Sequence, residues 1–181
     1  MSVLDEISEA MGDTRQDPSS SLIRQSDVRR WMESRDVEAL GALFTLLMNR
    51  SHYMRIDPPL SFDEYQSFVM NYYKRCIREN PDGEWADTRY SAGWSLVNWF
   101  KGLWYDSEVP RSALEQLKVW MAEMYLDGDE DVRTCLVTAT LEHLFEERDI
   151  ARYFADWRND EELKKALDEA LEWQKPEATR R

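Results

Sequence analysis

The sequence predicts an all-α protein, an irregular antiparallel helical bundle of about eight helices with HEAT-like helix hairpins. Apolar residues recur at intervals of three and four over most of the 181 residues, which is the period of one helix face. The six glycines and six prolines fall mainly between these periodic segments, where they end helices and begin turns. No alternating apolar and polar run flanked by hairpin turns indicates a sheet.

The periodic segments and their boundary signals define the expected helices in order. Residues 3–11 form either a short amphipathic helix or a loosely attached arm, and residues 12–21, with an Asp-Pro pair and three serines, form a linker. The remaining helices are expected at 27–33, 37–49, 62–78, 88–105, 110–126, 132–146, 149–157 and 160–173. We therefore predict an N-terminal arm and linker over residues 1–25, one helical domain over 26–173 and a frayed tail over 174–181.

Helix starts carry the clearest local signals. Ser26, Asp36 and Asp129 are expected N-caps, and Ser61 with Glu64 three residues later is a capping-box pattern. Asn80-Pro81-Asp82-Gly83 is a stop and turn after the helix that begins at Ser61. Residues 51–60 contain two consecutive prolines and are expected to form a loop.

The segment 88–105 is the most apolar of the expected helices. Only Arg89 and Lys101 are charged within it, and aromatic residues occupy more than one side. A helix that is apolar nearly all round is expected to be surrounded by other helices. We therefore expect it at the centre of the fold, with Trp94 and Trp104 packed in the core.

Two segments, residues 37–50 and 132–146, have the composition of the inner helices of HEAT repeats. No strict repeat period accompanies them, so an irregular bundle is favoured over a regular solenoid.

The composition excludes several classes of function. The chain has 36 acidic and 23 basic residues, a net charge of −13, so free nucleic acid is not an expected partner. Two cysteines are too few for a disulfide scaffold. The longest uncharged stretch is shorter than a membrane span, and residues 1–10 do not resemble a signal peptide. We expect a cytoplasmic protein with no membrane association.

Motifs that carry chemistry are almost absent. Residues 127–131, Asp-Gly-Asp-Glu-Asp, begin like a calcium loop, but the sixth position is Val132 and the twelfth is Thr138, so helix capping by carboxylates is the favoured interpretation. The two histidines lack the spacing of zinc or di-iron sites. Cys76 and Cys135 fall on apolar helix faces and are expected to be buried and reduced, although a Cys–His dyad stays open. We predict no catalytic residue, no metal and no cofactor.

Acidic residues are concentrated near the C-terminus. Residues 127–173 contain 15 acidic and six basic side chains, a net charge of −9. If the acidic clusters share one face, they form a negative surface suited to a basic protein. The loop residue Trp85 either plugs the core or anchors a partner. The candidate partner-binding residues are Asp127, Asp129, Glu130, Asp131, Glu142, Glu146, Glu147, Asp149, Asp160, Glu161, Glu162 and Trp85.

Several segments of the C-terminal half carry a family resemblance. They are Arg-Tyr-Ser-Ala-Gly-Trp-Ser-Leu-Val-Asn-Trp-Phe at 89–100, the Trp-x-Ala-Glu-x-Tyr segment at 120–125, Thr-Leu-Glu-His-Leu-Phe-Glu at 140–146 and Tyr-Phe-x-x-Trp at 153–157. Together they resemble a family of small acidic all-helical bacterial proteins associated with immunity to polymorphic toxins, over residues 36–173. The resemblance implies a helical, HEAT-like or bundle fold and a protein-binding function, with no catalytic residue to carry over.

Three functions are compatible with these observations. The first is an immunity protein that binds a cognate toxin through its acidic surface. The second is a helical adaptor or regulatory subunit for another basic protein. The third is a carboxylate-dependent enzyme that removes a toxin's modification, for which no positive motif exists in the sequence.

Overall fold

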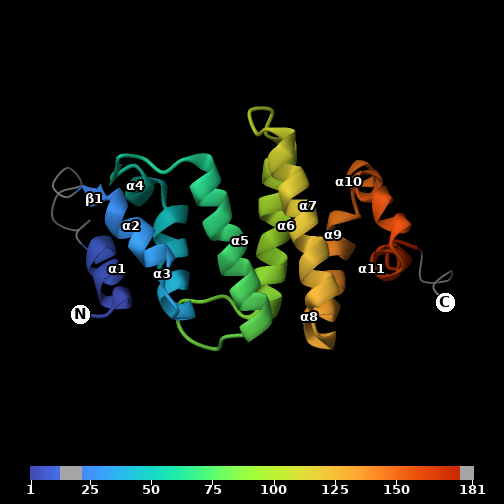
Figure 1. The fold of residues 1–181 in the computed structure, drawn as a ribbon, viewed down its shortest axis with the longest axis horizontal. Coiled ribbons are helices and arrows are strands. Elements are labelled where there is room, and N and C mark those ends of the chain that lie inside the picture. The colour runs from blue at the N-terminus through green and yellow to red at the C-terminus, as the bar shows by residue number, and fades with distance from the viewer. Residues whose placement is uncertain (13–21, 176–181) are drawn as a thin grey trace. The chain divides into compact units, whose positions relative to one another are not determined.

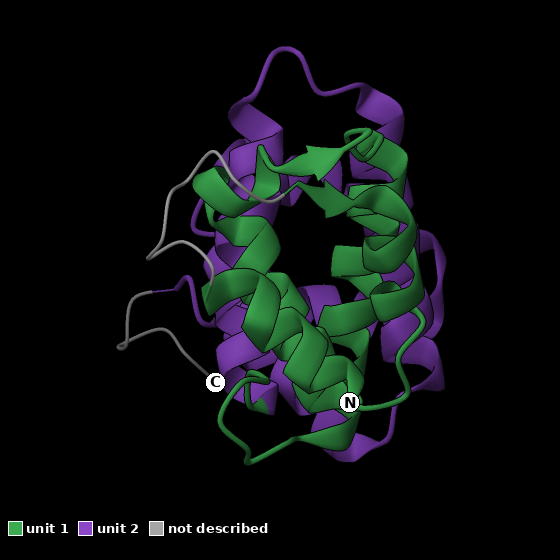
Figure 2. Ribbon diagram, turned by 90° about the vertical axis from the view of Figure 1, so that its left-hand side faces the viewer, with its two compact units in different colours: residues 1–88 green, residues 89–181 purple. Residues whose placement is uncertain are grey.

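The computed structural model describes residues 1–12 and 22–175, so most of the predicted linker and tail lie outside the described residues. Of the residues described, 75% are helical, in about ten helices, somewhat more than the predicted eight. The chain divides into two compact units, residues 1–88 and residues 89–181 (Figure 2). The all-α prediction is confirmed, while a single domain over residues 26–173 stays a prediction.

The first unit contains five helices and two very short strands within its described residues. They are α1 (Val3–Gly12), β1 (Ile23–Arg24), α2 (Gln25–Met32), α3 (Val37–Met48), α4 (Arg50–Tyr53), β2 (Ile56–Asp57) and α5 (Phe62–Glu79).

Helix α1 is packed into the first unit and is not a loosely attached arm. It contacts α3, and its residue Ile7 is fully buried. Glu6 accepts hydrogen bonds from the Trp31 indole at 2.8 Å and from Arg30 on α2. Apolar burial and a carboxylate bonded to α2 together hold α1 in place.

Most of the predicted boundary signals of the first unit are confirmed. The Asp36 side chain accepts from the Glu38 amide at the start of α3, and Ser61 with Glu64 forms a capping box. Helix α5 ends at Glu79, and Asn80 takes the left-handed conformation. The predicted cap at Ser26 is wrong, because α2 begins at Gln25, two residues before the predicted start, and Arg24 occupies the N-cap position without a side-chain capping bond.

The segment 51–60 is more ordered than the predicted loop. It contains most of α4, capped by the Asn49 side chain, and β2, which pairs in parallel with β1 through Ile23 opposite Ile56. The sequence shows no alternation here because each strand is only two residues long.

The secondary structure of the second unit is entirely helical within its described residues, with short connections between the helices. They are α6 (Arg89–Tyr105), α7 (Arg111–Asp127), α8 (Glu130–Cys135), the π-helical segment η2 (Leu136–Leu141), α9 (Glu142–Leu144), α10 (Arg148–Tyr153), the 3₁₀ segment η3 (Ala155–Asn159) and α11 (Glu161–Glu172). The segments α8, η2 and α9 follow one another without a break and replace the single predicted helix at 132–146.

Helix α6 runs parallel to the continuous α8–η2–α9 helix. Arg89 pairs with Asp131 near the start of both, the Thr140 hydroxyl donates to the Gly93 carbonyl at 3.0 Å, and Lys101 lies near Glu146 and Glu147 at the far end. Helix α7, which lies beside α6 in Figure 1, makes the return connection between the two.

The prediction that α6 is surrounded by other helices is wrong. Ala92, Gly93 and Leu96 are buried, but Trp94 is 50% exposed and Tyr105 is 66% exposed. The buried residues of α6 are Ala92, Gly93, Leu96, Val97, Phe100 and Leu103. Gly93 allows the close approach to η2, and Trp94 lies at the edge of this contact, where its ring stacks on His143. Trp104 is also only partly buried rather than part of the core.

The C-terminal helices pack around Phe154, which is fully buried. Its ring contacts the rings of Phe100, Phe145 and Trp157 at centroid distances of 5.0 to 5.8 Å. Helix α11 packs against η2, η3 and α7. This aromatic cluster fixes the positions of the acidic turns that connect the last helices.

Candidate interaction surface

The first acidic cluster, Asp127 to Asp131, lies at the start of α8. Asp129 is the N-cap, and its carboxylate accepts from the Val132 amide at 2.9 Å. Asp131 pairs with Arg89 at 3.1 Å. Within the described residues, no group of three or more His, Cys, Asp or Glu side chains is placed to hold a metal ion. Helix capping therefore accounts for the calcium-loop-like start of this segment.

The second cluster, Glu142, Glu146, Glu147 and Asp149, lies between α9 and α10. The Lys101 ammonium on α6 is 4.0 Å from Glu146 and 3.3 Å from Glu147, and the Tyr105 hydroxyl donates to Glu147. Asp149 pairs locally with an arginine on its own helix. Glu146 and Glu147 thus contact side chains at the C-terminal end of α6.

The third cluster, Asp160, Glu161 and Glu162, begins α11. The Asp160 side chain accepts from the amides of Glu162 and Leu163 and caps the helix. Glu162 pairs with Lys165 and lies 3.7 Å from Arg133 on α8. Arg133 therefore brings the third cluster close to the first.

These contacts place the acidic clusters on two sides of the α8–η2–α9 helix. Asp131, Glu146 and Glu147 lie along α6, while Glu130 and Glu162 lie towards α7 and α11. The prediction named the clusters without deciding whether they converge. In the tertiary structure, one group of carboxylates lies on the α6 side of the α8–η2–α9 helix and another lies on the side of α7 and α11.

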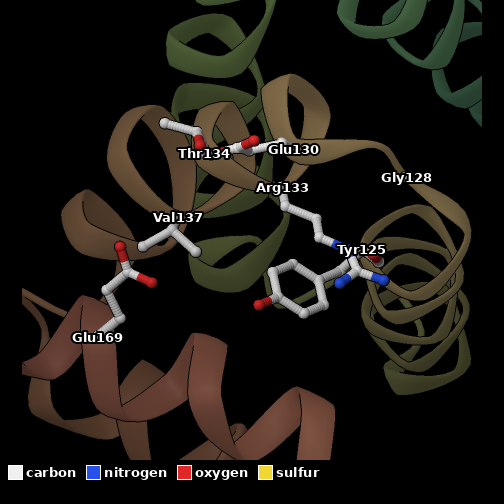
Figure 3. A pocket seen from close by; sticks show the side chains of 7 residues that line it. All are labelled: Tyr125, Gly128, Glu130, Arg133, Thr134, Val137 and Glu169. Carbon is white, nitrogen blue, oxygen red and sulfur yellow. Dashed lines mark hydrogen bonds between the residues drawn. The ribbon is translucent and has the colours of Figure 1, made fainter.

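The side towards α7 and α11 contains a polar pocket of about 390 Å³ (Figure 3). Its lining residues are Tyr125, Gly128, Glu130, Arg133, Thr134, Val137 and Glu169. Arg133 donates to the carbonyls of Tyr125 and Leu126 at 2.9 and 3.0 Å, and its guanidinium lies over the Tyr125 ring. Burial raises the pKa of the Tyr125 hydroxyl.

The role of Arg133 in this pocket is structural. Its two bonds go to carbonyls in the last turn of α7, and the Tyr125 carbonyl also accepts from the Gly128 amide. The pocket lining therefore holds two carboxylates, those of Glu130 and Glu169, and one guanidinium.

The side along α6 contains three exposed aromatic residues that were not among the predicted site residues. Tyr90, Trp94 and Tyr105 are 48%, 50% and 66% exposed. No local signal distinguishes them from Leu96, Val97 and Phe100, which are equally apolar residues of the same helix but are buried.

Trp85 lies in the first unit, in the loop between α5 and α6. Its side chain is half-buried, and its backbone amide donates to the Glu38 carboxylate at 2.8 Å. A Cβ atom at Gly41 would lie 2.5 Å from the Trp85 carbonyl carbon, so the loop packs directly on α3. A partner-binding role for Trp85 stays a prediction.

Both cysteines are buried and free, as predicted. Burial raises the pKa of Cys76 to about 12 and that of Cys135 to about 11. The Cys135 thiol contacts the Arg89 carbonyl at 3.3 Å. A thiol in such a setting is a poor source of the thiolate that nucleophilic chemistry requires.

Comparisons with protein families, with curated proteins and with solved structures find no match to this chain. Over residues 1–12 and 22–175, no helix has both the length and the apolar character that crossing a membrane demands.

Proposed function

We propose that the protein is a non-catalytic binding module, an immunity protein that neutralises a basic bacterial toxin domain through the acidic surface of its second unit. The observation that carries this proposal is the net charge of −9 over residues 127–173, which form α8 to α11 within one compact unit. Exposed carboxylates that make no ion pair with described residues support it, namely those of Glu130, Glu161, Asp168 and Glu169.

The physical basis is electrostatic steering. A negative surface accelerates the association of a positively charged partner and disfavours acidic competitors. Toxin domains that act on nucleic acids need positive charge around their sites, so an acidic protein can reach and cover those sites. The family resemblance of residues 36–173 is consistent with this role.

The test begins with isolation of the partner from the native strain. Co-expression of this protein should then protect cells from the toxicity of that partner. Association is then measured by stopped-flow at low and moderate salt for a variant with Glu130→Gln, Asp131→Asn, Glu146→Gln and Glu147→Gln. We expect the association rate constant at low salt to fall about ten-fold or more, with a weaker dependence on salt.

A matched control separates position from total charge. Residues 1–88 carry 16 acidic and ten basic side chains, a net charge of −6, so the first unit is acidic as well. Neutralising its exposed residues Glu9, Glu33, Asp82 and Glu84 changes the total charge equally and should slow association much less. Equal slowing by both variants, or no slowing by either, would contradict the proposal. A basic partner without toxicity would indicate an adaptor instead.

A further inference from the structure

The outward face of α6 presents a row of aromatic side chains. Trp94, Asn98, Lys101 and Tyr105 are separated by three or four residues and therefore share one helix face, with Tyr90 one turn before Trp94. Trp94 and Tyr105 are at least half exposed. Large exposed aromatic residues of this kind are typical anchors in protein interfaces.

Trp94 is held in a defined orientation. Its indole stacks on the His143 imidazole with ring centroids 3.9 Å apart and an angle of 27° between the planes. The His143 Nδ1 atom lies 3.0 Å from Glu146 Oε1. Because Trp94 is 50% exposed, part of the indole stays open to solvent while one face rests on the imidazole. An anchor ordered before binding loses less conformational entropy when a partner arrives.

Carboxylates flank this aromatic row at both ends. Glu146 and Glu147 lie beside Lys101 and Tyr105, and Asp131 lies beside Arg89. At the Tyr105 end of the row, the Lys101 ammonium lies near two carboxylates, those of Glu146 and Glu147. The surface therefore combines exposed aromatic side chains with an excess of negative charge, an arrangement that suits a cationic group and disfavours an anionic one.

We propose that this α6 surface, formed by Tyr90, Trp94, Tyr105, Glu146 and Glu147, is the anchor site for an arginine-bearing segment of the basic partner. The guanidinium stacks on the exposed part of the Trp94 indole and pairs with Glu146 or Glu147. Arginine is favoured over lysine because its planar group stacks on an aromatic ring while it donates to a carboxylate. The inference rests on the proposed function and names the chemistry that the partner presents.

The test measures the binding of two acetylated peptides of equal length and charge, (Arg-Gly)₆ and (Lys-Gly)₆, to the full chain. Binding is measured by fluorescence anisotropy at low salt. We expect the arginine peptide to bind more tightly, and Trp94→Leu to weaken its binding about two- to five-fold with a smaller effect on the lysine peptide. The control Trp173→Leu removes another exposed tryptophan, 46% exposed at the end of α11, and should change neither affinity.

A second variant tests whether binding depends on the His143 ring that stacks on the Trp94 indole. His143→Ala keeps Trp94 but removes the stacked ring, so arginine-peptide binding should weaken while far-UV circular dichroism stays unchanged. The double variant Glu146→Gln with Glu147→Gln should weaken binding of both peptides.

The failure of this inference is distinguishable from that of the proposed function. Equal affinities for the two peptides, or equal effects of Trp94→Leu and Trp173→Leu, would overturn the α6 anchor. In that case, slower association of the four-residue charge variant with the isolated partner would still support the proposed function. Conversely, tighter binding of the arginine peptide that depends on Trp94 would support the anchor even if no toxin is found.

Discussion

Replacing Gly93 with alanine tests how closely α6 packs on η2. A Cβ atom at this position would lie 2.8 Å from the Ala139 Cβ and 3.1 Å from the Cys135 sulfur. Carbon atoms in van der Waals contact are about 3.5–4.0 Å apart, so α6 or η2 must move by roughly 1 Å. The same movement would lengthen the hydrogen bond from Thr140 to the Gly93 carbonyl, now 3.0 Å.

The expected magnitude is the difference between two opposing effects. Overpacking a buried contact costs about 1–3 kcal/mol, whereas alanine in place of glycine within a helix contributes about 1 kcal/mol. We therefore expect Gly93→Ala to lower the free energy of unfolding by roughly 1 kcal/mol. Gly102→Ala in the same helix is the matched control, because a Cβ there meets nothing within 4 Å. That variant should raise the free energy of unfolding by about 0.5–1 kcal/mol.

Urea denaturation followed by far-UV circular dichroism measures both changes. With a urea dependence of about 2 kcal/mol/M, the two variants should differ in midpoint by roughly 1 M, with wild type between them. If Gly93→Ala stabilises the protein as much as Gly102→Ala, the close parallel packing of α6 on η2 is wrong. Unchanged stability of Gly102→Ala would instead show that helix propensity does not contribute at that site.

Three further predictions concern titration, capping and thiol access. Burial, with a smaller effect of the nearby Arg55 charge, lowers the pKa of His52 below 6.5, and its Nδ1 has no hydrogen-bond partner among the described residues. The neutral imidazole is favoured in the folded state, so its contribution to the free energy of unfolding is complete above pH 6.5 and falls as the pH drops below that value. His52→Asn should weaken this pH dependence of the free energy of unfolding, measured by urea titrations from pH 7.5 to 5. Ser61→Ala removes the capping-box hydroxyl of α5 and should cost about 1 kcal/mol in the same assay, whereas a cost below about 0.3 kcal/mol would show that the cap contributes little. Both buried thiols, Cys76 and Cys135, should react with Ellman's reagent at pH 8 only at the rate of unfolding, and rapid labelling in native buffer would contradict their burial.

Local sequence signals were sufficient to predict the longer helices and most of their ends, but not the short helix α4. Asp36, Ser61 and Asp129 cap the helices they were expected to cap, since a capping side chain bonds to amides only two or three residues away. The fold class follows for the same reason, because a period of three and four residues is a property of one segment. The interruption of the predicted helix at 132–146 by π-helical turns was not detectable, since it accompanies the contact with Gly93 on α6.

The sequence by itself determined that the protein is helical, strongly acidic and almost without catalytic motifs. Tertiary structure alone decided which side of each helix meets water. Trp94 and Tyr105 resemble core residues in composition, yet both are at least half exposed. Helix α6 meets η2 closely through Gly93, and this leaves the two side chains at the edge of the contact, beside His143 and Glu147. Likewise, α6 and α11 lie on different sides of the α8–η2–α9 helix, and this separates Glu146 and Glu147 from Glu130 and Glu162. Such relations depend on contacts between residues that are 29 to 49 positions apart, and no local pattern encodes them.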